Sequence, residues 1–212
     1  MSIAPLPVRV WVGAGFAAWI LTVGTGLTML WAYAGTPGPP AAALPAWPAA
    51  AFARDAGKPA LVLFLHPQCP CSRATVSELA RLLAEVHASP AVYALIYRPS
   101  DAKAGWEHTD LWDSAAAIPG VHVMTDDGGA GAHAFGAIVS GQALLYDAAG
   151  ALQFSGGITG ARGHEGDNPG HSAVREFLNG SHPATASTPS FGCLLHSESD
   201  SRRAAALDQA PR

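Results

Sequence analysis

The sequence predicts an α/β domain that follows one apolar, membrane-spanning helix. Two observations lead to this fold class. Strand-like apolar runs alternate with helical patterns through the middle of the chain. A long stretch near the N-terminus, residues 10–34, carries no charged side chain. The chain has 212 residues, which suits one domain of common size with shorter flanking segments.

Residues 10–34 predict a transmembrane helix, because about 20 apolar residues span a bilayer. Trp31 and Tyr33 are of the types that gather at membrane interfaces. Arg9 precedes the span, and positively charged segments tend to stay inside. We therefore expect a short cytoplasmic N-terminus, residues 1–9, and a single-pass protein of the bacterial inner membrane with its C-terminal domain in the periplasm.

A cleaved signal peptide is the alternative for the same stretch, since Ala32-Tyr33-Ala34 has the form of a cleavage site. The apolar stretch is longer than the ~7–15 residues of a usual signal core, and one basic residue precedes it. These features favour an uncleaved anchor. Either reading delivers the domain to the same oxidising compartment.

Residues 35–48 (GTPGPPAAALPAWP) predict a semi-extended spacer that does not pack, because the stretch is rich in Pro and Ala. Residues 49–56 predict a short helix before the first core strand. We expect the folded domain to occupy residues 49–180. A polar tail, residues 181–212, should be disordered apart from the apolar stretch Phe191–Leu195.

The segment from residue 60 to residue 87 predicts a strand, a cysteine-containing loop and a helix. Ala60–Leu65 is an unbroken apolar run without helical period, as in a buried strand. The loop HPQCPCS follows, and apolar residues then recur at helical spacing: Val76, Leu79, Ala80, Leu83 and Val86. A thiol at a helix N-terminus feels the positive end of the helix dipole, which favours the reactive thiolate.

The later elements follow from the same patterns. The two last strands flank Asp147–Gly150, which predicts a β-hairpin. A Gly-rich loop, Ser155–Gly170, precedes the last helix. The predicted strands are Val92–Tyr97, Val121–Met124, Ala143–Tyr146 and Leu152–Phe154, and the predicted helices are Trp106–Ala117, Ala130–Phe135 and His171–Leu178.

Charge excludes one class of partner. The formal net charge is −4, only 13% of residues are charged, and the basic residues are scattered. A nucleic-acid binder gathers Lys and Arg on one face or along one helix. We therefore expect no nucleic-acid partner.

The chain contains three cysteines, so at least one thiol stays unpaired, alternates between partners or pairs with another chain. Cys69 is expected to act as a nucleophilic thiolate and Cys71 to resolve the mixed disulfide that it forms, with Cys193 as the other candidate for the resolving thiol. A Cys69–Cys71 bond would close a tight ring, and strained disulfides are labile. The apolar patch around Cys193 could dock back on the domain; alternatively, Cys193 has no function.

His66 and Pro67 end the first core strand. As a cation, His66 would lower the pKa of the Cys69 thiol. The alternative is a solvent-facing loop histidine.

The order of elements, with a cysteine loop between the first core strand and its helix, resembles the thioredoxin fold, a central mixed sheet flanked by helices. Residues 126–157 are similar to thioredoxin-like proteins of the bacterial envelope. The stretches FLHPQCPCSRAT, GGITGARGHEGDN and FGC resemble the RedB family of membrane-anchored thioredoxin-like proteins. The resemblance implies thiol–disulfide exchange with protein thiols and disulfides as partners, and no cofactor.

Two features depart from thioredoxin. Its C-x-x-C motif is C-x-C here, because Ser72 stands where the second cysteine would be and Cys71 lies one residue earlier. Ser140-Gly141 occupies the place of the cis-proline before the hairpin. Because cis peptide bonds are essentially a proline phenomenon, that feature should be lost.

The resemblance also concerns the loop Gly156–Gly170, which in the thioredoxin fold lies beside the cysteine motif. Arg162 and His164 are its candidate site-lining residues. The alternative is an ordinary surface loop, since Gly, Asn, Asp and Pro are common loop residues.

Two other functions stay open beside thiol–disulfide exchange. Cys69, Cys71 and Cys193, with a histidine such as His66 or His164, could bind Cu(I) in an envelope copper-binding or copper-delivery protein. The substitutions at Ser72 and Gly141 would also suit a redox-inactive interaction module that has kept the fold.

Overall fold

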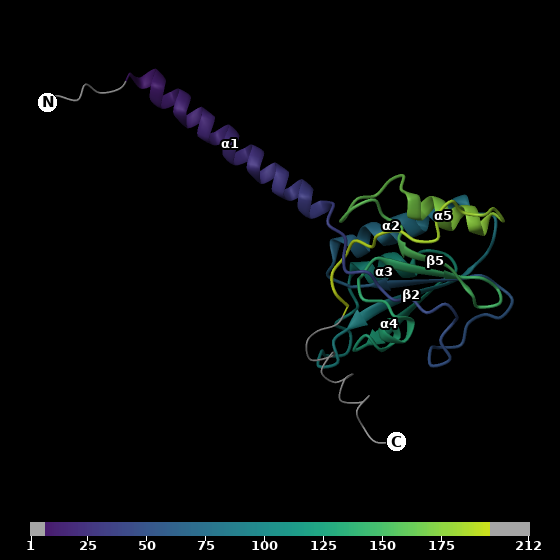
Figure 1. Cartoon of the computed structure of the whole chain (residues 1–212). Coiled ribbons are helices and arrows are strands. Elements are labelled where there is room, and N and C mark those ends of the chain that lie inside the picture. Colours follow the sequence, from purple (N-terminus) through teal and green to yellow (C-terminus); the bar gives the residue numbers. More distant parts are fainter. Residues whose placement is uncertain (1–6, 196–212) are drawn as a thin grey trace. The chain divides into compact units, whose positions relative to one another are not determined.

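The computed structural model describes residues 7–195, and its contacts divide the chain into two units, one ending at Thr36 and one beginning at Pro37 (Figure 1). The first unit contains helix α1, and the second contains every strand and the other helices of the described residues. Each unit is described by itself.

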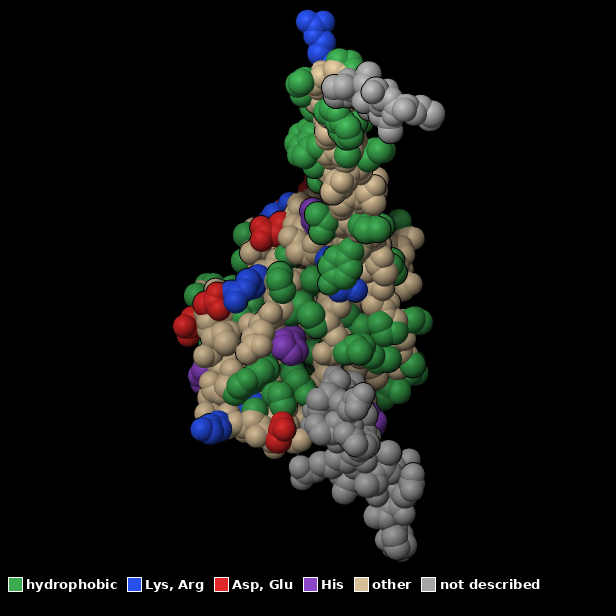
Figure 2. Space-filling view, turned by 90° about the vertical axis from the view of Figure 1, so that its left-hand side faces the viewer, with side chains coloured by type: hydrophobic (Ala, Val, Ile, Leu, Met, Phe, Trp, Pro, Cys, Tyr) green, Lys and Arg blue, Asp and Glu red, His purple; other side chains and the backbone are tan. Residues whose placement is uncertain are grey.

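Helix α1 spans Val8–Ala34 and buries none of its residues. Hydrophobic side chains cover its surface (Figure 2). The hydroxyl groups of Thr22 and Thr28 donate to the carbonyls of Ala18 and Thr25, so they bring no unpaired donor to this surface. At ~1.5 Å per residue the helix exceeds the ~30 Å of a hydrocarbon core. Its length and composition therefore suffice to cross a membrane.

The second unit is built on one mixed sheet of five strands, in the order β3-β2-β1-β4-β5. Strands β1, β2 and β3 run parallel, and β4 and β5 are antiparallel to their neighbours. The bounds are Ala60–Leu65 for β1, Ala91–Arg98 for β2, Val121–Asp127 for β3, Gln142–Tyr146 for β4 and Leu152–Gly157 for β5.

Helices cover both faces of this sheet, and Figure 1 shows α5 and α4 on opposite sides. Helices α2 (Pro70–Glu85), α3 (Asp110–Ala116) and α5 (Pro169–Leu178) share one hydrophobic cluster with the sheet. Helix α4 (Ala130–Phe135) packs in a second cluster on the other face. This arrangement is the thioredoxin-like fold, which confirms the predicted fold class.

Strand β1 shows why its sequence lacks alternation. Its odd-numbered residues, Leu61, Leu63 and Leu65, belong to the cluster under α2 and α5. Its even-numbered residues, Ala60, Val62 and Phe64, belong to the cluster under α4. Successive side chains of a strand point to opposite faces, so a strand between two helical layers is apolar throughout.

The predicted spacer, residues 35–48, differs from expectation because its part from Gly38 onward packs within the second unit. Gly38 N–H donates to the Ser190 carbonyl at 2.8 Å, and Ala46 pairs with Ala151 of the hairpin. The Trp47 ring lies 4.9 Å from Phe135 and 5.3 Å from Tyr146, between ring centroids. The half-buried Trp47 ring brings apolar area against the core, which outweighs the extended preference of its proline-rich neighbours.

Local boundaries differ as well. Residues 49–56 form turns and irregular backbone rather than the predicted helix. Helix α3 begins at Asp110 and not at Trp106, because turns occupy the preceding residues and Gly105 has a φ of +84°. Strand β3 continues through Asp127, which pairs with Arg98.

The tail also differs from expectation where the structure describes it. Ser155 N–H of β5 donates to the Ala186 carbonyl at 3.0 Å, and Thr188 N–H donates back to the Ser155 carbonyl at 3.3 Å. Leu194 then forms a bridge with Val139. Backbone groups of the edge strand β5 and of the segment before β4 supply these partners, which composition alone does not reveal. The rest of the predicted tail, 196–212, lies outside the described residues.

Candidate functional site

The candidate site lies where β1 ends and α2 begins. Cys69 is the residue preceding the first turn of α2, and Pro70 follows it at the position where a missing N–H costs nothing. Cys69 N–H donates to the His66 carbonyl at 3.1 Å, and His66 N–H donates to the Ser72 hydroxyl at 2.9 Å. Ser72, in the place of a second thioredoxin cysteine, therefore fixes the loop that carries Cys69.

The Cys69 sulfur is completely buried and surrounded by donors. The Cys193 thiol lies 3.1 Å from it and the Ser140 hydroxyl 3.4 Å. The Cys71 thiol and the Ser72 backbone N–H also donate to it. The Cys71 bond is the largest cause that lowers the pKa of Cys69 to about 3, against burial, which raises it. Cys69 is therefore a thiolate at neutral pH.

The two other thiols keep their protons. The hydrogen bond to Cys69 is the largest cause that raises the pKa of Cys71. Burial, followed by the hydrogen bond to Cys69, raises the pKa of Cys193 to about 11. The site thus holds one thiolate and two thiols that donate to it.

Ser140 and Gly141 precede β4, and the Ser140 hydroxyl contacts the Cys69 sulfur. Gly141 N–H donates to the Phe64 carbonyl at 2.7 Å, and its φ is +82°. A Cβ there would lie 3.0 Å from both the Phe191 carbonyl oxygen and the Thr75 hydroxyl, so glycine suits both the backbone and the space. No peptide bond of residues 7–195 is cis, as the absence of proline here predicted.

The tail carries Cys193 into the site by strand-like pairing. Ser140 N–H donates to the Cys193 carbonyl at 2.8 Å, and Cys193 N–H donates to the Ser140 hydroxyl at 2.9 Å. Leu195 N–H donates to the Ile138 carbonyl at 2.9 Å, and the Leu195 side chain is 1% exposed within the α4 cluster. Hydrogen bonds and burial therefore hold the tail on both sides of the thiol.

The two candidate residues of the Gly-rich loop differ. Arg162 donates to the Gly192 carbonyl at 2.8 Å, and its charge lowers the pKa of Cys71 and of Cys193, against the larger causes that raise them. Gly163 forms a backbone hydrogen bond with Cys71. His164 is exposed, and its ring contacts the Arg162 carbonyl at 2.8 Å. Of this pair, Arg162 contacts the tail beside the thiols, whereas the hydrogen bond of His164 stays within the loop.

His66 differs from the predicted cation. Its ring stacks on Tyr97 at 5.6 Å and meets the edge of Trp106 at 5.8 Å. Nδ1 accepts from Gln68 N–H at 3.2 Å. Burial lowers the pKa of His66, and the Cys69 thiolate opposes this only in part. The imidazole is therefore neutral near pH 7, and the thiolate is held by hydrogen bonds rather than by a neighbouring cation. Pro67 is buried, and its carbonyl accepts from the Thr109 hydroxyl at 3.3 Å.

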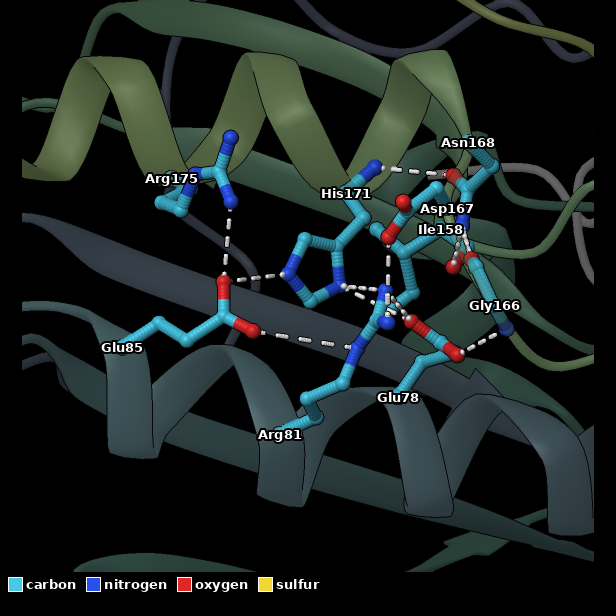
Figure 3. Close-up of polar contacts among 9 residues, drawn as sticks. All are labelled: Glu78, Arg81, Glu85, Ile158, Gly166, Asp167, Asn168, His171 and Arg175. Atoms are coloured by element: carbon cyan, nitrogen blue, oxygen red, sulfur yellow. Dashed lines mark hydrogen bonds and ion pairs between the residues drawn. The ribbon is translucent and has the colours of Figure 1, made fainter.

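A buried polar network fastens the Gly-rich loop to α2 (Figure 3). Glu78 accepts from Gly166 N–H at 2.6 Å and contacts His171 Nδ1 at 2.9 Å. His171 points from α5 towards α2 and contacts Glu85 through Nε2 at 3.2 Å. Asn168 begins α5 by accepting from His171 N–H at 2.9 Å. The network thereby positions the loop that presents Arg162.

Sequence reasoning missed two contributors to the site. The sequence places Ser140 before the hairpin but does not identify it as a donor to Cys69. The available signal was a hydroxyl-bearing residue at the place where thioredoxins carry the cis-proline. Glu78 and His171 lie far apart in the sequence, and no local pattern pairs them. Within residues 7–195, no three His, Cys, Asp or Glu side chains are grouped to hold a metal ion.

The low pKa of Cys69 predicts that the stability of the reduced protein depends on pH more strongly than the stability of the oxidised protein. Between about 3 and the ordinary value of 9.0, the unfolded reduced chain keeps a proton on Cys69 that the folded chain has lost. The stability of the reduced protein should thus rise with pH across this window, and the oxidised protein lacks this contribution. Chemical unfolding of the reduced and the oxidised protein at about pH 5 and pH 8 measures this contribution of Cys69 to stability. Cys71 and Cys193 stay protonated at both pH values.

The expected result is a gain in stability from pH 5 to pH 8 that is larger for the reduced protein. Ionisation of carboxylates and histidines affects both forms and cancels in the comparison. Equal gains in the two forms would contradict a Cys69 thiolate in the folded state.

No protein-family model matches the chain. No curated protein matches it either. Solved structures that are similar include a hypothetical protein from Sinorhizobium meliloti 1021, with 23% identity and a TM-score of 0.53 over 67% of this chain and 81% of that one. An uncharacterized conserved protein from Geobacillus kaustophilus has 16% identity and a TM-score of 0.53 over 78% of this chain and 92% of that one.

A secreted Mycobacterium tuberculosis disulfide oxidoreductase, described as homologous to E. coli DsbE, is also similar. It has 19% identity and a TM-score of 0.39 over 59% of this chain and 80% of that one. At these identities the likenesses to the two structures with a TM-score of 0.53 concern the fold alone. The activity must be argued from the site.

Proposed function

We propose that the protein is a membrane-anchored thiol–disulfide oxidoreductase whose redox pair is Cys69 and Cys193. The observation that carries the proposal is the Cys69 thiolate, held by four donors with the Cys193 sulfur 3.1 Å away. Thiolates attack disulfides, and a second thiol at contact distance completes a two-electron exchange. Protein thiols and disulfides are the proposed partners.

The choice of Cys193 over Cys71 changes the expected role of the C-x-C motif. Cys71 lies in the first turn of α2 and donates to the Cys69 thiolate, so it supports the low pKa of that thiol. A bond between these two cysteines would close a tight ring, whereas Cys193 approaches from a separate segment. Cys71 therefore acts as a hydrogen-bond donor in this proposal.

The proposed location follows from α1, which is long and apolar enough to anchor the chain. Residues 1–9 would stay in the cytoplasm and the domain would act in the periplasm of a bacterial inner-membrane protein, where disulfides persist. Membership of the RedB family is part of the proposal. Two of the three stretches that carry this resemblance contact the third at the site: Cys69 of the first and Arg162 of the second contact the FGC tail.

A redox titration with mapping of cysteine pairs by mass spectrometry tests the proposal. Cys69 and Cys193 should form a reversible disulfide. Its potential should lie towards the oxidising end of the range of about −120 to −270 mV, because a stabilised thiolate favours the reduced form. Absence of any reversible disulfide at Cys69 in that range would refute the proposal and leave a redox-inactive module as the better reading.

A further inference from the structure

We infer that an external thiol partner exchanges with Cys193, the tail cysteine, and not with Cys69. The inference rests on the proposed function, because it assumes a Cys69–Cys193 disulfide. Cys69 is 0% exposed, whereas Cys193 is exposed. A partner sulfur approaching the folded protein therefore reaches Cys193 first.

Cys193 occupies a fixed place on the surface of the site. Its carbonyl and N–H both bond to Ser140, and Arg162 holds the Gly192 carbonyl immediately before it. The buried Leu195 anchors the chain immediately beyond it. The tail thus covers Cys69 while presenting Cys193, and no swinging motion is needed for an encounter.

The tail lies this close to Ser140 because residue 192 is glycine. A Cβ at this position would overlap the Ser140 carbonyl and contact the Ser140 hydroxyl. Backbone cannot yield as the end of a flexible side chain can, so any larger residue would displace the tail. The tail can therefore cover Cys69 only because a glycine, Gly192, precedes Cys193.

The chemistry of the leaving group favours the same sulfur. A thiolate attacks a disulfide at one sulfur, and the other sulfur leaves with the electron pair, faster when its pKa is lower. When Cys193 is bonded to the partner, Cys69 keeps the hydrogen bonds from Cys71, Ser140 and Ser72, which lower its pKa. Burial, by contrast, raises the pKa of Cys193. Attack at Cys193 releases the stable Cys69 thiolate, whereas attack at Cys69 would release the poorer leaving group.

The complete step oxidises a dithiol polypeptide. One partner thiolate attacks Cys193 Sγ, the Cys193–Cys69 bond breaks, and Cys69 keeps the electron pair. The second partner thiolate attacks the partner sulfur of the mixed disulfide, and Cys193 leaves and takes up a proton. The partner loses two electrons and two protons to become a disulfide. Cys69 and Cys193 gain the two electrons, and the other proton goes to solvent.

The test uses the full chain in detergent micelles, oxidised and shown by mass spectrometry to contain the Cys69–Cys193 disulfide. Reduced glutathione is added, the reaction is stopped with acid after a short time, and the modified cysteine is mapped. Glutathione is expected on Cys193 with at least a tenfold excess over Cys69, on the order of the discrimination that access and leaving-group pKa provide together. A predominant adduct on Cys69 or Cys71 would overturn the inference and leave the redox pair intact. Failure to form the Cys69–Cys193 disulfide would overturn both proposals.

A variant of Gly192 tests separately whether the tail covers Cys69. In the reduced Gly192→Ala protein, Cys69 should react with iodoacetamide at least about tenfold faster than in the wild type, because the displaced tail no longer covers the thiolate. Gly160→Ala is the matched control, since a Cβ there meets only Asn168 Cβ at an ordinary 3.7 Å. Equal rates at Cys69 in the wild type and in Gly192→Ala would show that the tail does not cover Cys69, and would overturn the inference.

Discussion

Replacing Cys69 with serine is expected to slow the oxidation of a dithiol peptide by at least ~10³-fold, because the variant cannot form the Cys69–Cys193 disulfide that accepts the two electrons of the peptide. The variant keeps a hydroxyl in the place of the sulfur, so the four donors around it still have an acceptor. The fold should persist while the redox pair is lost. A single-turnover reaction of the oxidised full chain in detergent micelles with the dithiol peptide, followed by the disappearance of free peptide thiols, measures the effect.

Cys71→Ala is the informative control for that variant. Removing one hydrogen bond to a charged group costs about 1.5–3 kcal/mol, which would raise the pKa of Cys69 from about 3 without bringing it to 7. Cys69 would still be ionised near pH 7, so this variant should keep most of its activity. If Cys71→Ala is as inactive as Cys69→Ser, Cys71 is a member of the redox pair, and the assignment of that role to Cys193 is wrong.

The second large effect concerns stability. Glu78→Ala is expected to lower the free energy of unfolding by about 3–5 kcal/mol, because it leaves buried groups without their charged partner. Glu78 is 1% exposed and His171 2% exposed, and Gly166 N–H would lose its acceptor. Chemical unfolding of the full chain in detergent micelles, followed by near-ultraviolet circular dichroism, measures the change.

Glu165→Ala is the matched control, since it removes an exposed carboxylate from the same loop. Such surface changes usually lie within about ±0.5 kcal/mol. Similar losses in the two variants would mean that the buried network adds little and that the loop is held by other contacts.

The parts of the fold that are local in sequence could be predicted from it. The strand–loop–helix unit around Cys69 was predicted because an apolar run, a punctuated loop and a helical period follow one another directly. Helix α4 was predicted with its observed bounds, Ala130–Phe135, where glycines with positive φ flank a short apolar segment. The β-hairpin was predicted for a similar reason, since its two short strands directly flank the turn Asp147–Gly150.

Contacts between distant residues could not be predicted in the same way. Cys193 and Cys69 are 124 positions apart, and nothing in the polar composition around the tail shows which sheet edge it meets. The neutral state of His66 depends on burial against Tyr97 and Trp106, which is a property of the packed structure. Trp47 in a proline-rich stretch was the one available sign that the predicted spacer packs.

The pairing of the tail with β5 also bears on how copies of this chain behave next to one another. An open sheet edge offers unpaired N–H and C=O groups to any extended segment, and self-association often begins there. Here Ala186 and Thr188 already use the groups of Ser155, and Pro189 accepts from Gly157 at 3.3 Å. Residues 186–189 thus protect the β5 edge from self-association, and loss of residues beyond 184 would remove this protection together with Cys193.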